Sequence, residues 1–104
     1  MKVEFFTFND LHFREHPLAE YGYYATHAVL DLPDGHQVSV ITGKHAYHDS
    51  GSYEVAVFCP NGNIASDVHT YMSRSEINAL LKQVHMGSYE YYDFEDWRSS
   101  QNDV

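Results

Sequence analysis

Alternating apolar and polar positions predict a series of short strands along the first two thirds of the chain. The clearest segment is 53–59, in which Tyr53, Val55 and Val57 fall on one face and Glu54 on the other. Successive side chains of a strand point to opposite sides, so this spacing places one apolar row against a core. The same kind of pattern, rich in β-branched and aromatic residues, predicts further strands at 2–8, 23–32, 36–42 and 64–71.

Turn sequences between these segments predict that consecutive strands pair as antiparallel neighbours. Pro33-Asp34-Gly35 follows one strand and Pro60-Asn61-Gly62-Asn63 follows another. Proline presets φ, and glycine accepts the positive φ that other residues avoid. Residues 9–20 are polar and predict a loop with one helical turn, capped by Asn9 or Asp10.

One amphipathic helix follows the last predicted strand. Ser73 and Glu76 form a capping box, in which each side chain accepts from the other residue's backbone amide. Gly87 is a natural end point. A single apolar stripe lies between them, at helical spacing, formed by Ile77, Leu80, Leu81 and Val84. The predicted fold class is therefore α+β: a small antiparallel β-meander of about four to six strands with one C-terminal amphipathic helix packed on one face.

The segment after the helix has a different composition. Acidic and aromatic residues interleave from Tyr89 to Trp97, and their alternation favours a last edge strand. We expect one domain over residues 1–97 and a disordered tail over residues 98–104. An edge strand can also be a contact surface, so both interpretations of the segment stay open.

The charge balance is unusual for a chain of 104 residues. Fifteen Asp and Glu against six Lys and Arg give a net charge of −9 with neutral histidines. Such a field repels phosphate backbones, which argues against direct nucleic acid binding, and attracts basic proteins instead. The alternative is that the charge serves solubility alone. The single cysteine, Cys59, excludes an internal disulfide, and we expect a cytoplasmic protein without a membrane span.

The acidic-aromatic segment supplies the candidate contact residues. Aromatic rings fill pockets on a partner, while carboxylates pair with its arginines and lysines. This combination predicts a partner-binding surface formed by Tyr89, Glu90, Tyr91, Tyr92, Asp93, Glu95, Asp96 and Trp97.

Eight histidines raise the question of a metal site. His45 and His48 are followed by Asp49 in the glycine-bounded loop 43–52, while His12 and His16 lie four residues apart. Zinc needs three or four such ligands in tetrahedral geometry, which these pairs supply only if their loops meet. Exposed loop histidines without metal are the alternative, and we expect no cofactor.

No catalytic motif accompanies these residues. The chain lacks G-x-S-x-G, a P-loop and G-x-G-x-x-G. His48 and Asp49 stand beside Ser50 and Ser52, but the members of a catalytic triad are usually spread along a chain. The sequence therefore predicts that the protein is not an enzyme.

The central stretch resembles a type of small phage-encoded protein of unassigned function. The residues that carry the resemblance run from Leu32-Pro33-Asp34-Gly35 through Val38-Ser39-Val40-Ile41-Thr42-Gly43 to Tyr53-Glu54-Val55-Ala56-Val57, followed by the helix. The resemblance covers residues 32–84 and leaves out both the N-terminal segment and the tyrosine-rich tail. It implies a phage or prophage origin and assigns no catalytic residue.

Together these observations predict an acidic protein-binding module. A phage or mobile-element inhibitor that occupies the basic groove of a host nucleic-acid-processing or defence protein has this size and charge. Two alternatives stay open: a structural subunit of a homo-oligomer, in the simplest case a homodimer, and a metal-binding domain or enzyme built on His12, His16, His45, His48 and Asp49.

Overall fold

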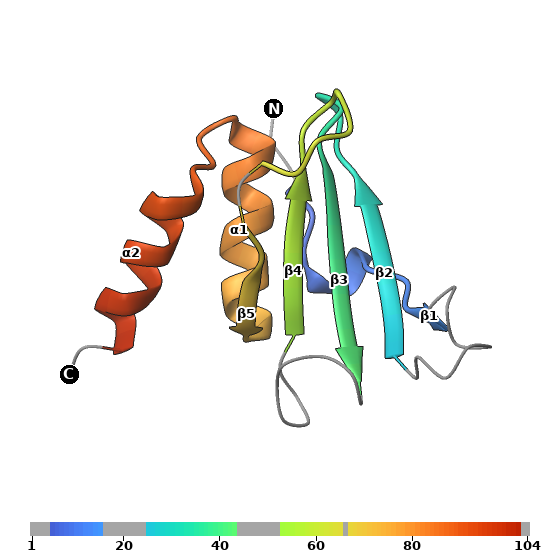
Figure 1. The fold of residues 1–104 in the computed structure, drawn as a ribbon, viewed down its shortest axis with the longest axis horizontal. Coiled ribbons are helices and arrows are strands. Elements are labelled where there is room, and N and C mark those ends of the chain that lie inside the picture. Colours follow the sequence, from blue (N-terminus) through green and yellow to red (C-terminus); the bar gives the residue numbers. More distant parts are fainter. Residues whose placement is uncertain (1–4, 16–24, 44–52, 66, 103–104) are drawn as a thin grey trace.

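Five antiparallel strands form one sheet in the order in which they occur in the chain (Figure 1). The computed structural model describes residues 5–15, 25–43, 53–65 and 67–102. The predicted meander is confirmed, with each strand hydrogen-bonded to the next in sequence. The strands are β1 Arg14–Glu15, β2 Ala25–Asp31, β3 Gln37–Gly43, β4 Tyr53–Phe58 and β5 His69–Met72.

The strand register places one apolar row after another on the same face of the sheet. Val40 of β3 lies opposite Ala28 of β2 and Val55 of β4, and all three are buried. The turn between β2 and β3 closes with a hydrogen bond from the Gly35 amide to the Leu32 carbonyl, at a Gly35 φ of 96°. Only glycine accepts that φ without steric cost, so the predicted hairpin is confirmed together with its cause.

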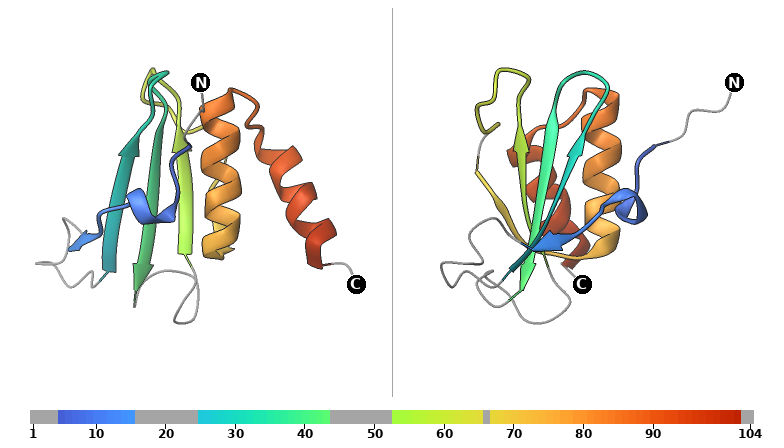
Figure 2. Two further views of the ribbon diagram at one scale, coloured as in Figure 1. Left: turned by 180° about the vertical axis from the view of Figure 1, so that it is seen from behind. Right: turned by 90° about the vertical axis from the view of Figure 1, so that its right-hand side faces the viewer.

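Helix α1, Arg74–Met86, covers this apolar face (Figures 1 and 2). The predicted capping box is present: the Glu76 amide donates to Ser73 Oγ at 3.2 Å, and the Ser73 amide donates to Glu76 Oε1 at 2.8 Å. The helix ends at Gly87, which has a left-handed φ of 75°. The predicted stripe is fully buried and faces the valine rows of the sheet; it consists of Ile77, Leu80, Leu81 and Val84.

The strand predicted at residues 2–8 is wrong for the part that the structure describes. Residues 5–7 have no regular structure, and a single 3-10 turn, η1, spans Phe8–Asp10. The aromatic rings pack on α1 instead of extending the sheet: Phe5 meets His85 edge-on at 5.1 Å, and the Phe8 amide donates to Asn78 Oδ1 at 2.7 Å. The helical turn expected within residues 9–20, with Asn9 or Asp10 as its cap, begins earlier: it contains both residues, and Thr7 takes the capping position.

The predicted last edge strand is also wrong, because the tail is a second helix. Helix α2 spans Tyr91–Asn102, so the expectation of one helix and of a disordered tail from residue 98 does not hold for residues 98–102. Phe94 is fully buried and joins the core, with Tyr91 and Arg98 on the same side one turn away. A helix places these three together, whereas a strand would put Tyr91 and Phe94 on opposite faces.

Strand β5 is shorter than the predicted segment 64–71. Ile64 makes only an isolated bridge to Phe58, and a bulge interrupts the pairing of β4 with β5. Tyr71 has a φ of 57°, the only positive φ at a non-glycine position among the described residues. Helix α2 lies beside this outer strand, while α1 lies on the face of the sheet that is turned away from the viewer in Figure 1 (Figure 2). The two helices and β5 therefore meet at one edge of the molecule.

Candidate functional site

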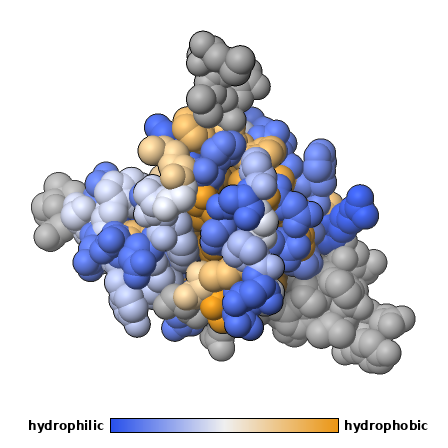
Figure 3. All heavy atoms as spheres, turned by 90° about the horizontal axis from the view of Figure 1, so that it is seen from above, coloured by the Kyte–Doolittle hydropathy of each residue, from blue (hydrophilic) through white to orange (hydrophobic). Residues whose placement is uncertain are grey.

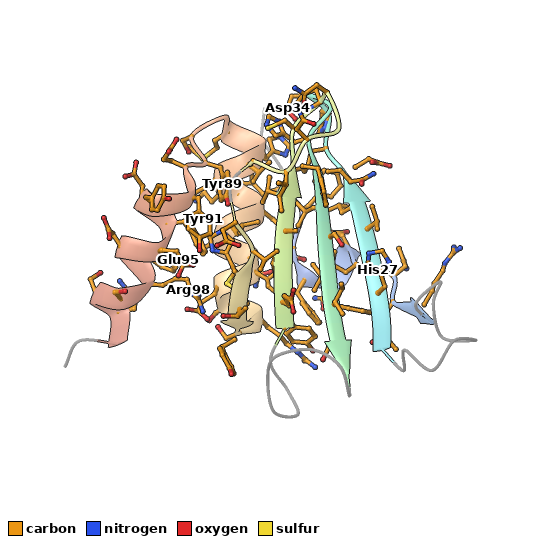
Figure 4. All side chains as sticks on the ribbon, in the orientation of Figure 1. His27, Asp34, Tyr89, Tyr91, Glu95 and Arg98 are labelled. Carbon is orange, nitrogen blue, oxygen red and sulfur yellow. The ribbon has the colours of Figure 1, made fainter. Side chains whose placement is uncertain are left out.

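A buried histidine connects β5 to the tail of the chain. His69 has no exposed surface and is the one polar side chain among the buried residues described. Its Nδ1 is hydrogen-bonded to Glu95 Oε2, and its Nε2 lies 2.7 Å from the Tyr89 hydroxyl. The Tyr91 ring stacks on the imidazole at 4.6 Å, and Phe94 meets it edge-on at 5.0 Å. Figure 4 shows Tyr89, Tyr91, Glu95 and Arg98 gathered between α2 and the sheet.

The protonation states of this cluster follow from its burial. Burial lowers the pKa of His69, although Glu95 opposes this, and the ring is neutral at pH 7. Nδ1–H therefore donates to Glu95, and Nε2 accepts from the Tyr89 hydroxyl. Burial and the neighbouring acidic groups raise the pKa of Tyr89 well above its usual value. Tyr89 therefore keeps its proton and acts as a hydrogen-bond donor.

Arg98 extends the cluster to α1 and to the backbone of β5. Its Nε donates to Glu76 at 2.9 Å, and its Nη1 donates to Glu95 at 2.8 Å. Its Nη2 donates to the carbonyls of Thr70 and Tyr71, at 2.9 and 3.2 Å. One planar guanidinium thus holds three elements together, which a point-like ammonium does not do.

Both carboxylates of the cluster are ionised. Burial raises the pKa of Glu95, but hydrogen bonds from Arg98 and His69 outweigh it and bring that pKa below its usual value. For Glu76, the Ser73 backbone and Arg98 likewise lower the pKa against the effect of burial. Two carboxylates, one guanidinium and a neutral imidazole leave the cluster itself with one uncompensated negative charge.

The eight predicted contact residues divide into two groups. Tyr89, Tyr91 and Glu95 point inward and belong to the His69 cluster, where Tyr91 also donates to the Val68 carbonyl at 3.4 Å. The other five lie on the exposed face of the tail, with Tyr92 69% and Trp97 36% exposed; they are Glu90, Tyr92, Asp93, Asp96 and Trp97. Seen from above, the side of the molecule formed by α2 is mostly hydrophilic (Figure 3).

The three carboxylates of that exposed face have no intramolecular partner in the described part of the chain. Every salt bridge found there involves other acids: Asp34, Glu76 and Glu95. No side-chain hydrogen bond there reaches Glu90, Asp93 or Asp96 either; the Phe94 amide bonds only the Glu90 backbone carbonyl. The residue before α2 and the exposed side of the helix therefore present carboxylates that no described residue pairs, and the His69 cluster holds this helix in place.

A groove of about 650 Å³ opens beside this face, between β5, α1 and the second half of α2. Its aromatic walls are Tyr71 and Trp97. Ser73 and Ser75 supply hydroxyls at the start of α1, and Glu76 and Arg98 form the charged part of the lining. The groove thus combines exposed aromatic rings with the outer side of the ionised cluster.

Most of the predicted metal ligands lie outside the described residues. These are His16, His45, His48 and Asp49, the last three of which belong to the loop after β3. His12 is described and exposed. Within the described ranges no group of three or more His, Cys, Asp or Glu side chains has a geometry that fits a metal ion. In the same ranges no helix has the length and apolar character needed to cross a bilayer.

Sequence reasoning missed the residues that organise the site: His69, Arg98, Glu76 as a charge partner, and Tyr71. A usable pattern was present in the tail, where Tyr91, Phe94 or Glu95, and Arg98 follow helical spacing. His69 carries no such pattern, because its partners lie 20 and 26 residues further along the chain.

Comparison with protein-family models, curated proteins and solved structures finds no match to this chain. The resemblance of residues 32–84 to small phage-encoded proteins therefore stays a prediction.

Proposed function

We propose that this protein is an acidic protein-binding module that presents the exposed face of helix α2 to a basic groove on its partner. The partner class that fits this chemistry is a nucleic-acid-processing or defence protein, whose function the bound module inhibits. A phage or mobile-element origin would accord with this role. The observation that carries the proposal is the set of carboxylates at the start of α2 and on its exposed side, which have no partner among the described residues and which the buried His69 cluster fixes in position.

The arrangement of the tail supports a contact role. Glu90, Asp93 and Asp96 have no partner among the residues that the structure describes, and Tyr92 exposes 69% of its surface among them. An exposed tyrosine adds contact area at little conformational cost, and carboxylates around it pair with cations on a partner. Because α2 is already held on the domain, binding requires little further ordering of this face.

The net charge supports a protein partner over a nucleic acid. A chain of charge −9 repels phosphates and accelerates encounter with a positively charged surface. A groove that binds nucleic acid has such a surface, and an acidic helix placed in it excludes the natural ligand. Inhibition then needs no catalytic residue in this chain.

The test compares two triple variants that lose the same charge. One neutralises the α2 face by Glu90→Gln, Asp93→Asn and Asp96→Asn. The control neutralises exposed acids elsewhere by Asp10→Asn, Asp31→Asn and Asp34→Asn. Each immobilised protein captures partners from a nuclease-treated bacterial lysate, and mass spectrometry quantifies them. Loss of three exposed charge pairs predicts roughly tenfold weaker capture by the α2 variant than by the control.

Three results would contradict the proposal: no partner above background, equal capture by both triple variants, or capture that does not weaken with salt. The mass of the protein in solution separates the homo-oligomer alternative. A stable dimer whose formation requires the α2 face would assign that face to self-association.

A further inference from the structure

We propose that the groove between β5, α1 and α2 takes an arginine side chain of the protein partner. This inference rests on the proposed function and names the chemical group that the partner inserts beside the α2 face. The lining that carries the argument consists of Tyr71, Trp97, Glu76 and Ser75.

The aromatic walls of the groove can bind a guanidinium group. Tyr71 exposes 61% of its surface and Trp97 36%, and both rings line the same groove. Trp97 is tilted against the buried Phe94 at 5.4 Å, so its position is fixed by the core. Aromatic faces attract a cation, tryptophan most strongly, and arginine also stacks flat on them.

Charge complementarity selects a cation over an anion or a neutral group. Arg98 is the only cation that lines the groove in the described part of the chain, and its donors are already directed to Glu76, Glu95 and two β5 carbonyls. Glu76 is the carboxylate of the lining, and Glu95 binds the same guanidinium from outside the lining, so the cluster has one more carboxylate than cations. A second guanidinium would balance the cluster, while a phosphate or carboxylate would add to the excess.

Tyr71 gives independent support, because its backbone is in the left-handed region with a φ of 57°. A tyrosine there is sterically disfavoured relative to glycine, yet its ring is largely exposed and contributes little to the core. The conformation directs an aromatic ring along one wall of the groove. A purely structural turn at this position would be served better by glycine or asparagine.

The experiment reads the groove directly, because Trp97 is the only tryptophan in the chain. The full-length protein is titrated with the capped peptide Gly-Arg-Gly, and Trp97 fluorescence is recorded. The matched probe is the same peptide with citrulline, which keeps the shape of arginine without its charge. We expect a saturable change with a dissociation constant of about 1 mM for the arginine peptide and binding at least about fivefold weaker for citrulline.

Tyr71→Gly is the test variant and Met86→Ser the control. Glycine accepts the φ of residue 71, so Tyr71→Gly folds and loses only the ring. We expect about fivefold weaker arginine binding for Tyr71→Gly and no change for Met86→Ser, because Met86 is exposed and lies outside the groove. Equal response to arginine and citrulline, full binding by Tyr71→Gly, or no saturable response in the millimolar range overturns the inference.

The peptide assay separates this inference from the proposed function. If partner capture depends on the α2 carboxylates but the groove does not bind the arginine peptide, the proposed function stands and only the groove inference is overturned. Arginine binding in the groove without capture of any basic protein supports the site and overturns the proposed partner. The protein alone is the last control. If its Trp97 fluorescence changes with protein concentration and its mass in solution doubles, a second copy of the chain occupies the groove, and the inference is overturned.

Discussion

At the scale of single residues, His69 shows how a buried polar group determines its surroundings. A neutral imidazole has one donor and one acceptor, and each needs a partner when water is excluded. Glu95 accepts from one nitrogen, and the Tyr89 hydroxyl donates to the other at 2.7 Å. The high pKa of Tyr89 keeps that donor in place over the whole physiological range. The cluster is therefore fully paired, and removing one atom from it should be costly.

Tyr89→Phe removes only the hydroxyl and leaves Nε2 of His69 without a donor. We expect the free energy of unfolding to fall by about 1–2 kcal/mol, the penalty of an unsatisfied buried acceptor. Chemical denaturation followed by circular dichroism measures the loss. The control is Tyr92→Phe, whose ring is exposed, and we expect it to stay within about 0.5 kcal/mol of the parent. Equal stability of the two variants would mean that the Tyr89 hydroxyl does not support the cluster.

At the scale of elements, the sequence predicted those whose signals are local. The capping box and stripe of α1 lie within one segment, and the turn of the β2–β3 hairpin depends on the adjacent residues Pro33, Asp34 and Gly35. The tail could not be assigned in this way, because its residues fit both a strand and a helix as far as Phe94. Its helical form depends on His69 and on the β5 carbonyls, and these contacts are long-range. The N-terminal rings were misassigned for the same reason, since α1 receives them.

Helix α2 also protects the outer edge of the sheet. Arg98 donates to the carbonyls of Thr70 and Tyr71 on β5, and Tyr91 donates to the carbonyl of Val68. Free carbonyls on an edge strand invite pairing with another chain. The residues that position the acidic face thus also satisfy backbone carbonyls along the β5 edge. This links the fold of the tail to its proposed contact role.

Arg98→Lys tests this link. A single ammonium does not reach two carboxylates and two carbonyls at once, so we expect about 2 kcal/mol of lost stability and loosening of α2. Hydrogen exchange should show faster exchange in α2 than in α1. Arg74→Lys is the control, since Arg74 is exposed and contacts only the Phe8 ring among its described partners. Unchanged exchange in α2 after Arg98→Lys would show that packing of Phe94 alone holds the helix.

At the scale of the whole molecule, acidity acts on stability in two opposite ways. Protonation of exposed acids relieves the self-repulsion of a chain with a charge of −9. The His69 cluster responds in the other direction, because its imidazole and its two carboxylates bind protons less readily when folded. The composition of the tail indicated the segment that carries the exposed acidic and aromatic residues, but this coupling could not be predicted, since it depends on burial of His69 that no local pattern reveals.

The pH dependence of stability separates the two effects. The folded pKa of His69 lies below its ordinary value of 6.5, so the unfolded chain binds the proton first. Its contribution is fully present above pH 6.5 and is lost as pH falls below that value. Glu76 and Glu95, whose pKa values are also lowered, add a second loss below about pH 4.5. Self-repulsion alone predicts the opposite slope, with stability rising as acids are neutralised.

His69→Asn isolates the first step, because asparagine can still donate to Glu95 but does not titrate. We expect the difference in unfolding free energy between parent and variant to favour the parent at pH 7.5 and to shrink steadily toward pH 5, as measured by denaturation at constant ionic strength. The other histidines are common to both proteins and cancel in the difference. A difference that stays constant over this range would mean that His69 titrates equally in the folded and unfolded chain, and that the cluster holds α2 by packing rather than by its protonation state.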